Sequence, residues 1–330
     1  MCFIVIALQI GCKDDEPDIL ANHNINLPSN FSEVIHPDDN AYNLARWTLG
    51  KKLFYDSVLS IDSTLSCASC HKSELSFSDN VAFSKGVKNR DGVRNAPSLA
   101  NVAYHPYFTR EGGVPTLEQQ VLVPIQEHNE FDFNIVLAGE RLAKDSTYVA
   151  MSLEAYNRGP DYYVITQALA NFERSLISKS SSFDKFLFQN QSDALTASQK
   201  QGMELFYSNV TNCFQCHSGP NFTNYAFENN GLYESYEDNG RRRLTGLESD
   251  EARFKVASLR NCEVTSPYMF DGSINTLEEV IEHYNSGGKV HPNKSEFLQP
   301  LNLTEKQKED LLAFLLSLTD NEFLTDPNFK

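Results

Sequence analysis

The chain carries Cys67-Ala68-Ser69-Cys70-His71 and, further on, Cys213-Phe214-Gln215-Cys216-His217. Each stretch has two cysteines separated by two residues and followed directly by a histidine. Thiols at this spacing can add to the two vinyl groups of a porphyrin, while the adjacent imidazole ligates its iron. A redox or zinc site also uses Cys-x-x-Cys, but paired zinc units usually lie closer together and need no such histidine. Two copies therefore predict two covalently bound c-type haems, with His71 and His217 as iron ligands.

The composition agrees with a folded protein. Hydrophobic residues make up 41% of the 330 residues and charged residues 22%, which is enough apolar material for buried cores. The formal net charge of −16 argues against a nucleic-acid partner, whose phosphates need a basic surface. It suits a partner with a positive patch, such as a small electron-donor protein of the cytochrome c or cupredoxin type.

The N-terminus predicts a targeting segment. Residues 1–11 are almost wholly apolar, and Cys12 follows, directly before a charged run. The apolar run is too short to span a bilayer but fits the core of a signal peptide. We therefore predict a lipoprotein-type signal over 1–12, a lipid anchor at Cys12, and a linker over 13–39, with an ordinary secretory signal as the alternative. The protein would be periplasmic or held in the cell envelope.

Two parts of the chain resemble each other, which predicts a duplicated domain. Gly50-Lys51-Lys52-Leu53-Phe54-Tyr55 precedes the first haem motif, and Gly202-Met203-Glu204-Leu205-Phe206-Tyr207 precedes the second. A second block follows each motif and repeats its residues at nearly identical spacing, from Ser98-Leu99 to Thr116-Leu117-Glu118 and from Ser258-Leu259 to Thr276-Leu277-Glu278. The expected domains are 40–165, which would bind peroxide, and 166–330, which would transfer electrons.

The fold class expected is mainly α, with two cytochrome c-like haem domains. Capping boxes, in which a threonine precedes Gln or Glu by three residues, predict helix starts at Thr116, Thr196, Thr276 and Thr304. Apolar residues at helical spacing predict a packed helix over 162–177, between the domains, and a closing helix over 311–318. Strand patterns are scarce.

The repeat also indicates which iron is open. Tyr284 stands at the same distance after Thr276 as Pro124 stands after Thr116. A phenolate can ligate ferric iron, whereas proline offers no ligand. The second iron is therefore predicted to be capped by Tyr284 and the first to be open. Met269 is the alternative ligand of the second iron, because a thioether is common in electron-transfer cytochromes.

An open haem that cleaves peroxide needs a group that moves a proton from one peroxide oxygen to the other. Glu130 lies a few residues after Pro124 and could return over the pocket, and Gln120, one turn before Pro124, could hold a water there. Glu127 and His128 are rivals for the acid–base role on the sequence alone.

The motifs around these residues resemble those of bacterial dihaem cytochrome c peroxidases and of the related dihaem enzyme that matures methylamine dehydrogenase. The resemblance covers about residues 40 to 318 and rests on five stretches: Leu49-Gly50-x-x-Leu53-Phe54, Arg94-Asn95-Ala96-Pro97-Ser98-Leu99, Leu117-Glu118-Gln119-Gln120, Leu259-Arg260-Asn261 and Ser266-Pro267-Tyr268-Met269-x-Asp271-Gly272.

This resemblance implies two mainly helical haem domains, often in a homodimer, with a calcium ion at their interface. By motif position Asn95 would contact the calcium, and Thr265 and Pro267 would add backbone carbonyls. The resemblance also implies that Glu130 is the catalytic glutamate and Gln120 the pocket glutamine.

Three departures from the family pattern bear on function. The loop from Lys72 to Arg94 lacks the histidine that must leave the first iron in other members. Tyr284 stands where the second haem usually has methionine, and a tyrosine at this position resembles the maturation enzyme. Arg110 aligns with the tryptophan expected between the haems, and the only tryptophan, Trp47, lies elsewhere.

Three functions remain from the sequence. The first is a peroxidase that reduces hydrogen peroxide to water at the first haem without prior reduction. The second is an enzyme of the same fold that oxidises side chains of a partner protein, which Tyr284 favours. The third is a non-catalytic electron carrier, which needs a sixth ligand on the first iron, such as His105 or His128.

Overall fold

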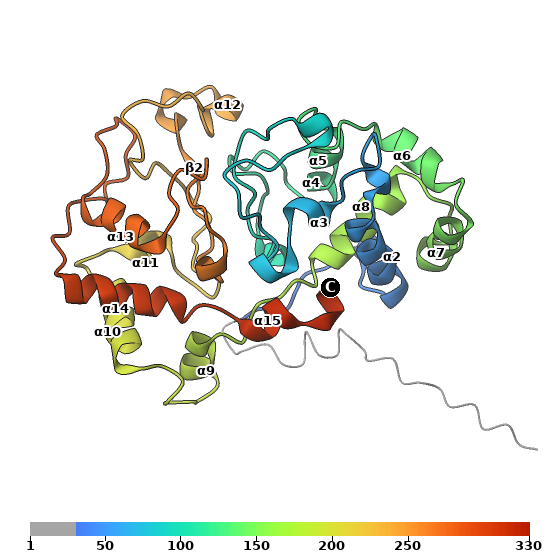
Figure 1. Ribbon diagram of the computed structural model, residues 1–330. Helices are drawn as coiled ribbons and strands as arrows, with labels where there is room; N and C mark the ends of the chain where they lie inside the picture. The colour runs from blue at the N-terminus through green and yellow to red at the C-terminus, as the bar shows by residue number, and fades with distance from the viewer. Residues whose placement is uncertain (1–30) are drawn as a thin grey trace, which may run out of the picture.

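The computed structural model describes residues 31–330, which form two lobes that lie side by side (Figure 1). The predicted signal segment, Cys12 and the first part of the linker lie outside the described residues. Over 31–330, no helix is both long and apolar enough to cross a membrane.

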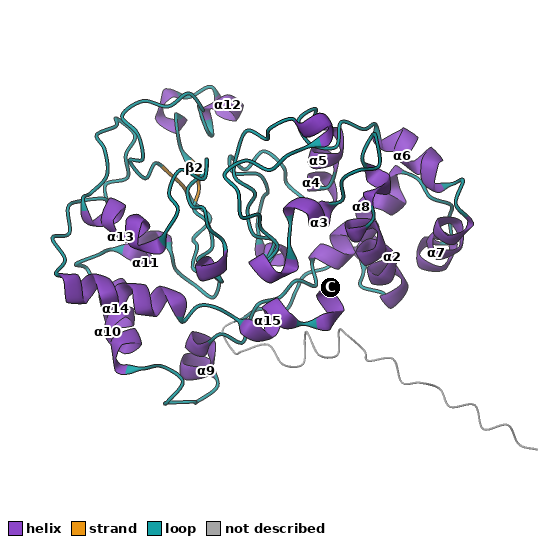
Figure 2. Ribbon diagram, in the orientation of Figure 1, coloured by secondary structure: helices purple, strands orange, loops and turns teal. Residues whose placement is uncertain are grey.

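Helices and long loops make up almost the whole molecule, as the sequence predicts (Figure 2). The N-terminal lobe contains the helices α2 (Leu44–Tyr55), α3 (Cys67–Cys70), α4 (Leu117–Gln120), α5 (Leu122–Gln126), α6 (Ile135–Leu142), α7 (Ser146–Tyr156) and α8 (Tyr162–Glu173). The chain continues through α9 (Ser182–Phe188), α10 (Ala197–Phe206), α11 (Cys213–Cys216), α12 (Arg242–Thr245), α13 (Leu277–Asn285), α14 (Glu305–Leu316) and α15 (Asn321–Thr325).

The strands are very short. β1 (Phe227–Glu228) and β2 (Phe254–Lys255) pair antiparallel, with Phe227 opposite Lys255. Single 3-10 turns link the helices at η1 (Asp38–Asn40), η2 (Ser57–Leu59), η3 (Ser73–Leu75), η4 (Val87–Asn89), η5 (Val102–Tyr104), η6 (Glu248–Asp250), η7 (Cys262–Val264) and η8 (Pro327–Phe329).

Each lobe is built on a pair of closely packed helices, α2 with α8 and α10 with α14. A glycine allows the close approach in both pairs. A Cβ atom on Gly50 would lie 1.9 Å from the carbonyl oxygen of Ala168, and one on Gly202 would lie 1.8 Å from that of Asp310. Such distances are far inside van der Waals contact, so only glycine fits. The glycines that open the two repeated blocks therefore have the same structural role.

Other local features recur at matched positions of the two lobes. Asn101 and Asn261 both adopt left-handed backbone conformations, with φ of 60° and 57°. A bridge joins Phe108 to Val114 in one lobe, and a bridge joins Tyr268 to Ile274 in the other. Left-handed φ is uncommon outside glycine, and asparagine is among the residues that tolerate it best. The two lobes thus share geometry as well as sequence.

The predicted helix starts are found in the structure. Thr196, Thr276 and Thr304 each form both hydrogen bonds of a capping box. At Thr116 the hydroxyl accepts from the backbone N–H of Gln119 at 3.3 Å, which is one half of the box. The two long helices predicted over 162–177 and 311–318 appear as α8 and α14 with shifted ends.

The predicted domain boundary at 165/166 falls inside α8. Val164, Leu169 and Phe172 pack in the same core as α2, so the whole of α8 belongs to the N-terminal lobe. The helix therefore completes the first core, whereas the sequence suggested a helix between the domains. The apolar pattern predicted this helix correctly but did not show which lobe its apolar face contacts.

The end of the chain also belongs to the first core. After α14 the chain returns beneath the N-terminal lobe (Figure 1), where Phe323, Leu324 and Phe329 are buried. The ring centroid of Phe77 lies 5.9 Å from that of Phe323 and 6.3 Å from that of Phe329. The Tyr55 hydroxyl donates to the carbonyl oxygen of Phe329. The last residues of the C-terminal half are thus part of the wall behind the first haem motif.

Removing one of these side chains should weaken the N-terminal lobe. We expect Leu324→Ala to destabilise the haem-loaded protein by about 2 kcal/mol, because it leaves a cavity in a core that the chain end can only partly close. Thermal unfolding should show a lower Tm. Leu316→Ala is the control, because Leu316 is 37% exposed whereas Leu324 is 7% exposed. Equal shifts for both variants would contradict a packing role for the chain end.

A buried polar network ties the lobes together. Asn261 donates to the hydroxyls of Ser76 at 2.9 Å and Ser178 at 3.2 Å, and Asn101 donates to the carbonyl oxygen of Ser178 at 2.9 Å. The Asp320 carboxylate accepts from Ser178 at 3.1 Å. Because buried polar groups are costly when unpaired, this network favours one arrangement of the two lobes.

Candidate active site

The first Cys-x-x-Cys-His motif forms the short helix α3, followed by a sharp turn. Ser66 caps the helix, and both hydrogen bonds of a capping box join Ser66 and Ser69. The Nδ1 atom of His71 lies 2.8 Å from the carbonyl oxygen of Phe77, whose backbone has a φ of 59°. A hydrogen bond from Nδ1 to this carbonyl fixes the ring and leaves Nε2 available to a metal.

The second motif repeats this geometry on α11. Nδ1 of His217 lies 2.9 Å from the carbonyl oxygen of Phe222, where φ is 51°. Desolvation lowers the pKa of both His71 and His217, so both imidazoles are neutral at neutral pH. Neutral, oriented imidazoles are what a haem iron requires of its proximal ligands.

The cysteines of the motifs suit haem attachment better than zinc. Cys67, Cys70, Cys213 and Cys216 are all free thiols, and burial raises the pKa of each. Zinc binds the thiolate form, which a raised pKa disfavours. Within residues 31–330, no cluster of three or more His, Cys, Asp or Glu side chains could hold a metal ion. The residues therefore fit two covalently attached haems.

Glu130 lies in a loop that folds back over the first motif. Phe131 N donates to the carbonyl oxygen of Pro124 at 3.2 Å, so the loop returns to α5. The carbonyl oxygen of Glu130 accepts from Val87 N at 2.9 Å. Gly86 allows this contact, because a Cβ atom there would lie 1.9 Å from the carbonyl oxygen of Asn129. The loop that follows the first motif thus holds Glu130 through its backbone.

The electrostatic environment places the Glu130 carboxyl beside the first motif. Desolvation, followed by the charge of Glu127, raises the pKa of Glu130 to about 7. Glu130 in turn contributes to the raised pKa of Cys67 and of Cys70, where burial is the larger cause. Glu130 is also exposed to solvent. A carboxyl whose pKa lies near 7 can both hold and release a proton at neutral pH.

Glu127, His128 and Glu130 are all exposed, and Glu130 is distinguished by its electrostatic effect on Cys67 and Cys70. The His128 side chain is 70% exposed and lies 3.2 Å from Asp132 and within 2.9 Å of Arg90. Glu127 is exposed as well. Gln120, in contrast, has a buried Oε1 atom without a hydrogen-bond partner. An unpaired buried amide oxygen is costly and is expected where a ligand or water binds.

Pro124 divides the helix that precedes Glu130. Proline has no N–H to donate to the carbonyl of Gln120, and α4 and α5 are separate helices that meet at Val121. The matching segment of the second lobe is the unbroken helix α13, which contains Tyr284. Desolvation raises the pKa of Tyr284 to about 12, with smaller contributions from Cys216 and Cys213. The phenol therefore lies within electrostatic range of both thiols of the second motif.

Asn230 joins the two candidate ligands of the second iron. Its Nδ2 atom donates to Sδ of Met269 at 3.1 Å, and it also hydrogen-bonds the phenol of Tyr284. Both side chains consequently lie in one pocket. The phenol of Tyr284 is in addition within electrostatic range of Cys213 and Cys216, which agrees with its predicted place beside the second haem.

The residues predicted to bind calcium do not fit that ion. Both oxygens of Asn95 accept from the Arg110 guanidinium: Nη2 lies 2.7 Å from the carbonyl oxygen and 3.2 Å from Oδ1. Thr265 and Pro267 lie in the loop that contacts Asn95, where Asn95 N donates to the carbonyl oxygen of Phe270 at 2.9 Å. A cationic side chain thus occupies both oxygens of Asn95, the predicted ligand at the centre of this site.

His105, the other candidate cap of the first iron, packs between the lobes. Its ring lies 5.2 Å from that of Tyr225, and the Lys255 ammonium lies 3.3 Å from its Nδ1 atom. Desolvation and Lys255 lower its pKa to about 3. The ring of His105 also stacks on that of Phe108 in its own lobe, with centroids 6.2 Å apart, so aromatic groups of both lobes hold it.

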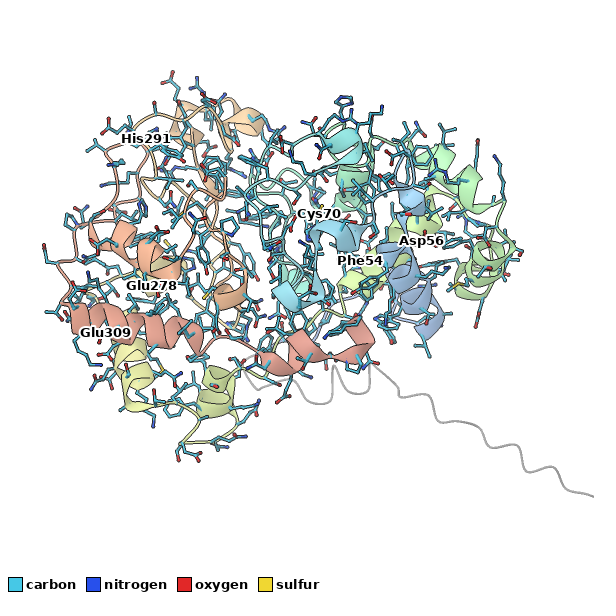
Figure 3. The ribbon with its side chains drawn as sticks, in the orientation of Figure 1. Phe54, Asp56, Cys70, Glu278, His291 and Glu309 are labelled. Atoms are coloured by element: carbon cyan, nitrogen blue, oxygen red, sulfur yellow. The ribbon has the colours of Figure 1, made fainter. Side chains whose placement is uncertain are left out.

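The structure adds residues that the sequence did not single out. Gly86 and Val87 hold the Glu130 loop, and Asn230 holds Met269 and Tyr284. Glu173 is buried beside the first motif, where it raises the pKa of Cys67, and desolvation raises its own pKa to about 8. Only the glycine carried a signal in the sequence, because glycine in a loop indicates a close backbone approach. Figure 3 shows Cys70 and Phe54 of this lobe.

Known proteins share this organisation. Residues 44–192 match the family model "Di-haem cytochrome c peroxidase". The chain is 33% identical to the methylamine utilization protein MauG of Methylorubrum extorquens, over 86% of this chain and 81% of that protein. It is 34% identical to the cytochrome c551 peroxidase of Nitrosomonas europaea, over 99% of this chain and 92% of that protein.

A solved structure gives the same result. The crystal structure of a MauG-like protein associated with microbial copper homeostasis superposes with a TM-score of 0.89 at 31% identity, and covers 93% of this chain and 98% of that one. Identity of this level over nearly the whole length, together with the two haem motifs, establishes the relationship. The chain belongs to the di-haem cytochrome c peroxidase family, whose members carry two c-type haems.

Proposed function

We propose that the protein is a di-haem c-type peroxidase that reduces hydrogen peroxide to two waters. The two electrons come from a small redox protein and the two protons from the solvent. The observation that carries the proposal is Glu130, an accessible carboxyl beside Cys67 and Cys70 with a pKa of about 7. The haem held by Cys67, Cys70 and His71 would bind peroxide and supply the electrons that cleave its O–O bond. The protein must then move protons.

Glu130 is suited to that task. Its carboxylate would accept the proton of the bound oxygen and return it to the departing oxygen, which leaves as water. A pKa near neutrality makes the group both a usable base and a usable acid. Gln120 would orient peroxide or a water through its unpaired Oε1 atom. Pro124 offers no ligand, and the loop 72–94 contains no histidine, so this side of the first iron would be open.

The second haem, attached to Cys213 and Cys216 with His217 as proximal ligand, would receive the electrons. We assign its sixth ligand to Tyr284, with Met269 as the alternative. The phenol has a pKa of about 12 and would exchange its proton for the ferric iron. The net charge of −16 suits a donor with a positive patch, such as a cytochrome c or a cupredoxin.

The proposal also covers how the two haem domains arose and where in the cell the protein lies. Matched helix pairs, glycines and asparagines support a duplication of one haem domain. The apolar segment before Cys12 supports export to the periplasm or cell envelope and a lipid anchor at that residue. A homodimer stays a prediction from the resemblance. Calcium is left out, because Arg110 holds the oxygens of Asn95.

A second function is favoured by Tyr284. The peroxide-oxidised haem pair would oxidise side chains of a partner protein, as the similarity to MauG suggests. Reduced cytochrome c and a candidate protein substrate distinguish the two functions, because only the true electron donor should speed the decay of the peroxide-oxidised protein. A purely electron-carrying role would need His105 or His128 on the first iron, and it has less support because His105 contacts Lys255 and His128 contacts Asp132.

The proposal is tested by mixing the fully ferric, haem-loaded protein with one equivalent of hydrogen peroxide in a stopped-flow spectrometer. We expect a fast Soret change without prior reduction. Its rate should rise about tenfold per pH unit and level off above about pH 7, because only deprotonated Glu130 can accept a proton. No reaction until the protein is half-reduced would contradict an open first iron.

Glu127→Gln provides the matched control for the pH profile. This variant removes a carboxylate that raises the pKa of Glu130, so the midpoint should move to lower pH while the maximal rate stays. A profile without any midpoint between pH 5 and 9 would remove Glu130 from the proton-transfer step.

A further inference from the structure

Asn95 lies where the two lobes meet, and each of its polar atoms has a partner. Its backbone N–H donates to the carbonyl oxygen of Phe270 at 2.9 Å, and Nδ2 donates to that of Val81 at 3.1 Å. Arg110 supplies the donors for its two oxygens, at 2.7 Å and 3.2 Å. The residue is 6% exposed. A second cation has no free oxygen to bind on Asn95.

The neighbouring carboxylates are engaged as well. Glu111 pairs with the guanidinium groups of Arg94 and Arg243. Asp238 pairs with Arg94 at 2.7 Å, and Asp271 accepts from the Tyr233 hydroxyl at 2.6 Å. Calcium prefers six to eight oxygen ligands, usually including carboxylates. The acids around Arg110 therefore neutralise arginines and hydrogen-bond a tyrosine instead of forming a calcium site.

Arg110 also connects the lobes through its backbone. Its carbonyl oxygen accepts from Lys255 N, on β2 of the second lobe, at 2.6 Å. Its guanidinium holds Asn95, which in turn contacts the loop of Phe270. Desolvation, followed by the charge of Arg94, lowers the pKa of Arg110 to about 10, so the side chain remains a cation at neutral pH.

We propose that Arg110 is the interdomain cation of this protein, and that its guanidinium takes the position and the structural role that the family resemblance assigns to a calcium ion. The guanidinium satisfies the Asn95 oxygens as a calcium ion would, and it lies within electrostatic range of Asp271, Glu111 and Asp238. The cation is then part of the chain and cannot be lost to a chelator. This role is independent of the substrate of the first haem.

The wild-type protein gives the first test. The haem-loaded chain is treated with EGTA, exchanged into metal-free buffer, and analysed for calcium by mass spectrometry and by equilibrium dialysis against calcium chloride. We expect less than one-tenth of a calcium ion per chain and the same Tm before and after EGTA. One tightly bound calcium per chain, or a Tm that falls with EGTA and recovers with calcium, would overturn the proposal.

Variants test whether the guanidinium stands in the place of the ion. Arg110→Gln should lower the Tm by several degrees, and millimolar calcium should restore at least half of the loss, whereas magnesium should not. Arg110→Lys keeps the charge and should remain insensitive to calcium. Arg242→Gln is the matched control, because Arg242 pairs with Glu251 at 2.6 Å within the second lobe. It should leave both the Tm and the calcium response unchanged.

A destabilised Arg110→Gln protein that ignores calcium would also overturn the proposal, since the freed oxygens of Asn95 would then have no affinity for the ion. If that variant does not fold, the wild-type calcium content and the response of Arg110→Lys still decide the question.

Discussion

Glu130→Gln is expected to lower the rate of reaction with hydrogen peroxide by about 10²- to 10⁴-fold, while both haems remain attached. Glutamine has nearly the same shape as glutamate but cannot accept the peroxide proton at neutral pH. The Glu130 loop is held by backbone contacts to Val87 and Pro124, so the substitution should leave its path unchanged. Stopped-flow rates at several peroxide concentrations measure the loss directly.

The pH profile separates proton transfer from simple damage to the pocket. Because the variant lacks the titrating carboxyl, its residual rate should no longer rise through pH 7. Glu127→Gln controls for the loss of a negative charge in the same loop. A Glu130→Gln protein with a rate near that of the wild type would assign the acid–base role to another group.

Tyr284→Met should convert the second haem to histidine–methionine ligation and raise its reduction potential by on the order of 0.1 V or more, because axial ligands shift haem potentials over a wide range. Tyr284→Phe should leave the second iron five-coordinate and give it a high-spin spectrum. Redox titration followed by absorption, and electron paramagnetic resonance of the ferric protein, measure both changes.

Met269→Leu is the control for this assignment. It removes the alternative ligand, and because the sulfur of Met269 is already hydrogen-bonded to Asn230, the spectrum should stay as in the wild type. If Met269→Leu changes the second haem and Tyr284→Phe does not, the two residues exchange roles.

The parts of this protein that can be predicted from sequence are those with local causes. A Cys-x-x-Cys-His segment contains nearly its whole site within five residues, and α3 and α11 have the short-helix geometry that it requires. Capping at Thr196, Thr276 and Thr304 likewise depends on residues three positions apart. The internal repeat also identified Pro124 and Tyr284 as equivalent positions, which the sequence of a single domain would not have shown.

Features that depend on distant segments could not be predicted in this way. The apolar face of α8 packs against α2, but its pattern would suit either lobe, so the sequence did not show which core the helix completes. The environment that raises the pKa of Glu130 comes from the folding of its loop onto residues 86 and 87. The resemblance indicates only that Arg110 stands where a tryptophan is expected, and the structure shows its guanidinium on Asn95.

The chain end has a consequence for how the protein matures. During synthesis and export an N-terminal domain usually folds first, as soon as it has emerged. Here the core behind the first haem motif includes Phe323, Leu324 and Phe329, so this lobe cannot reach its final packing until the last residues have arrived. The haem attachment site of Cys67 and Cys70 is synthesised early, but the core behind it is completed by residues 323–329, about 250 positions later. Folding of the first lobe is thereby coupled to synthesis of the segment that follows the second.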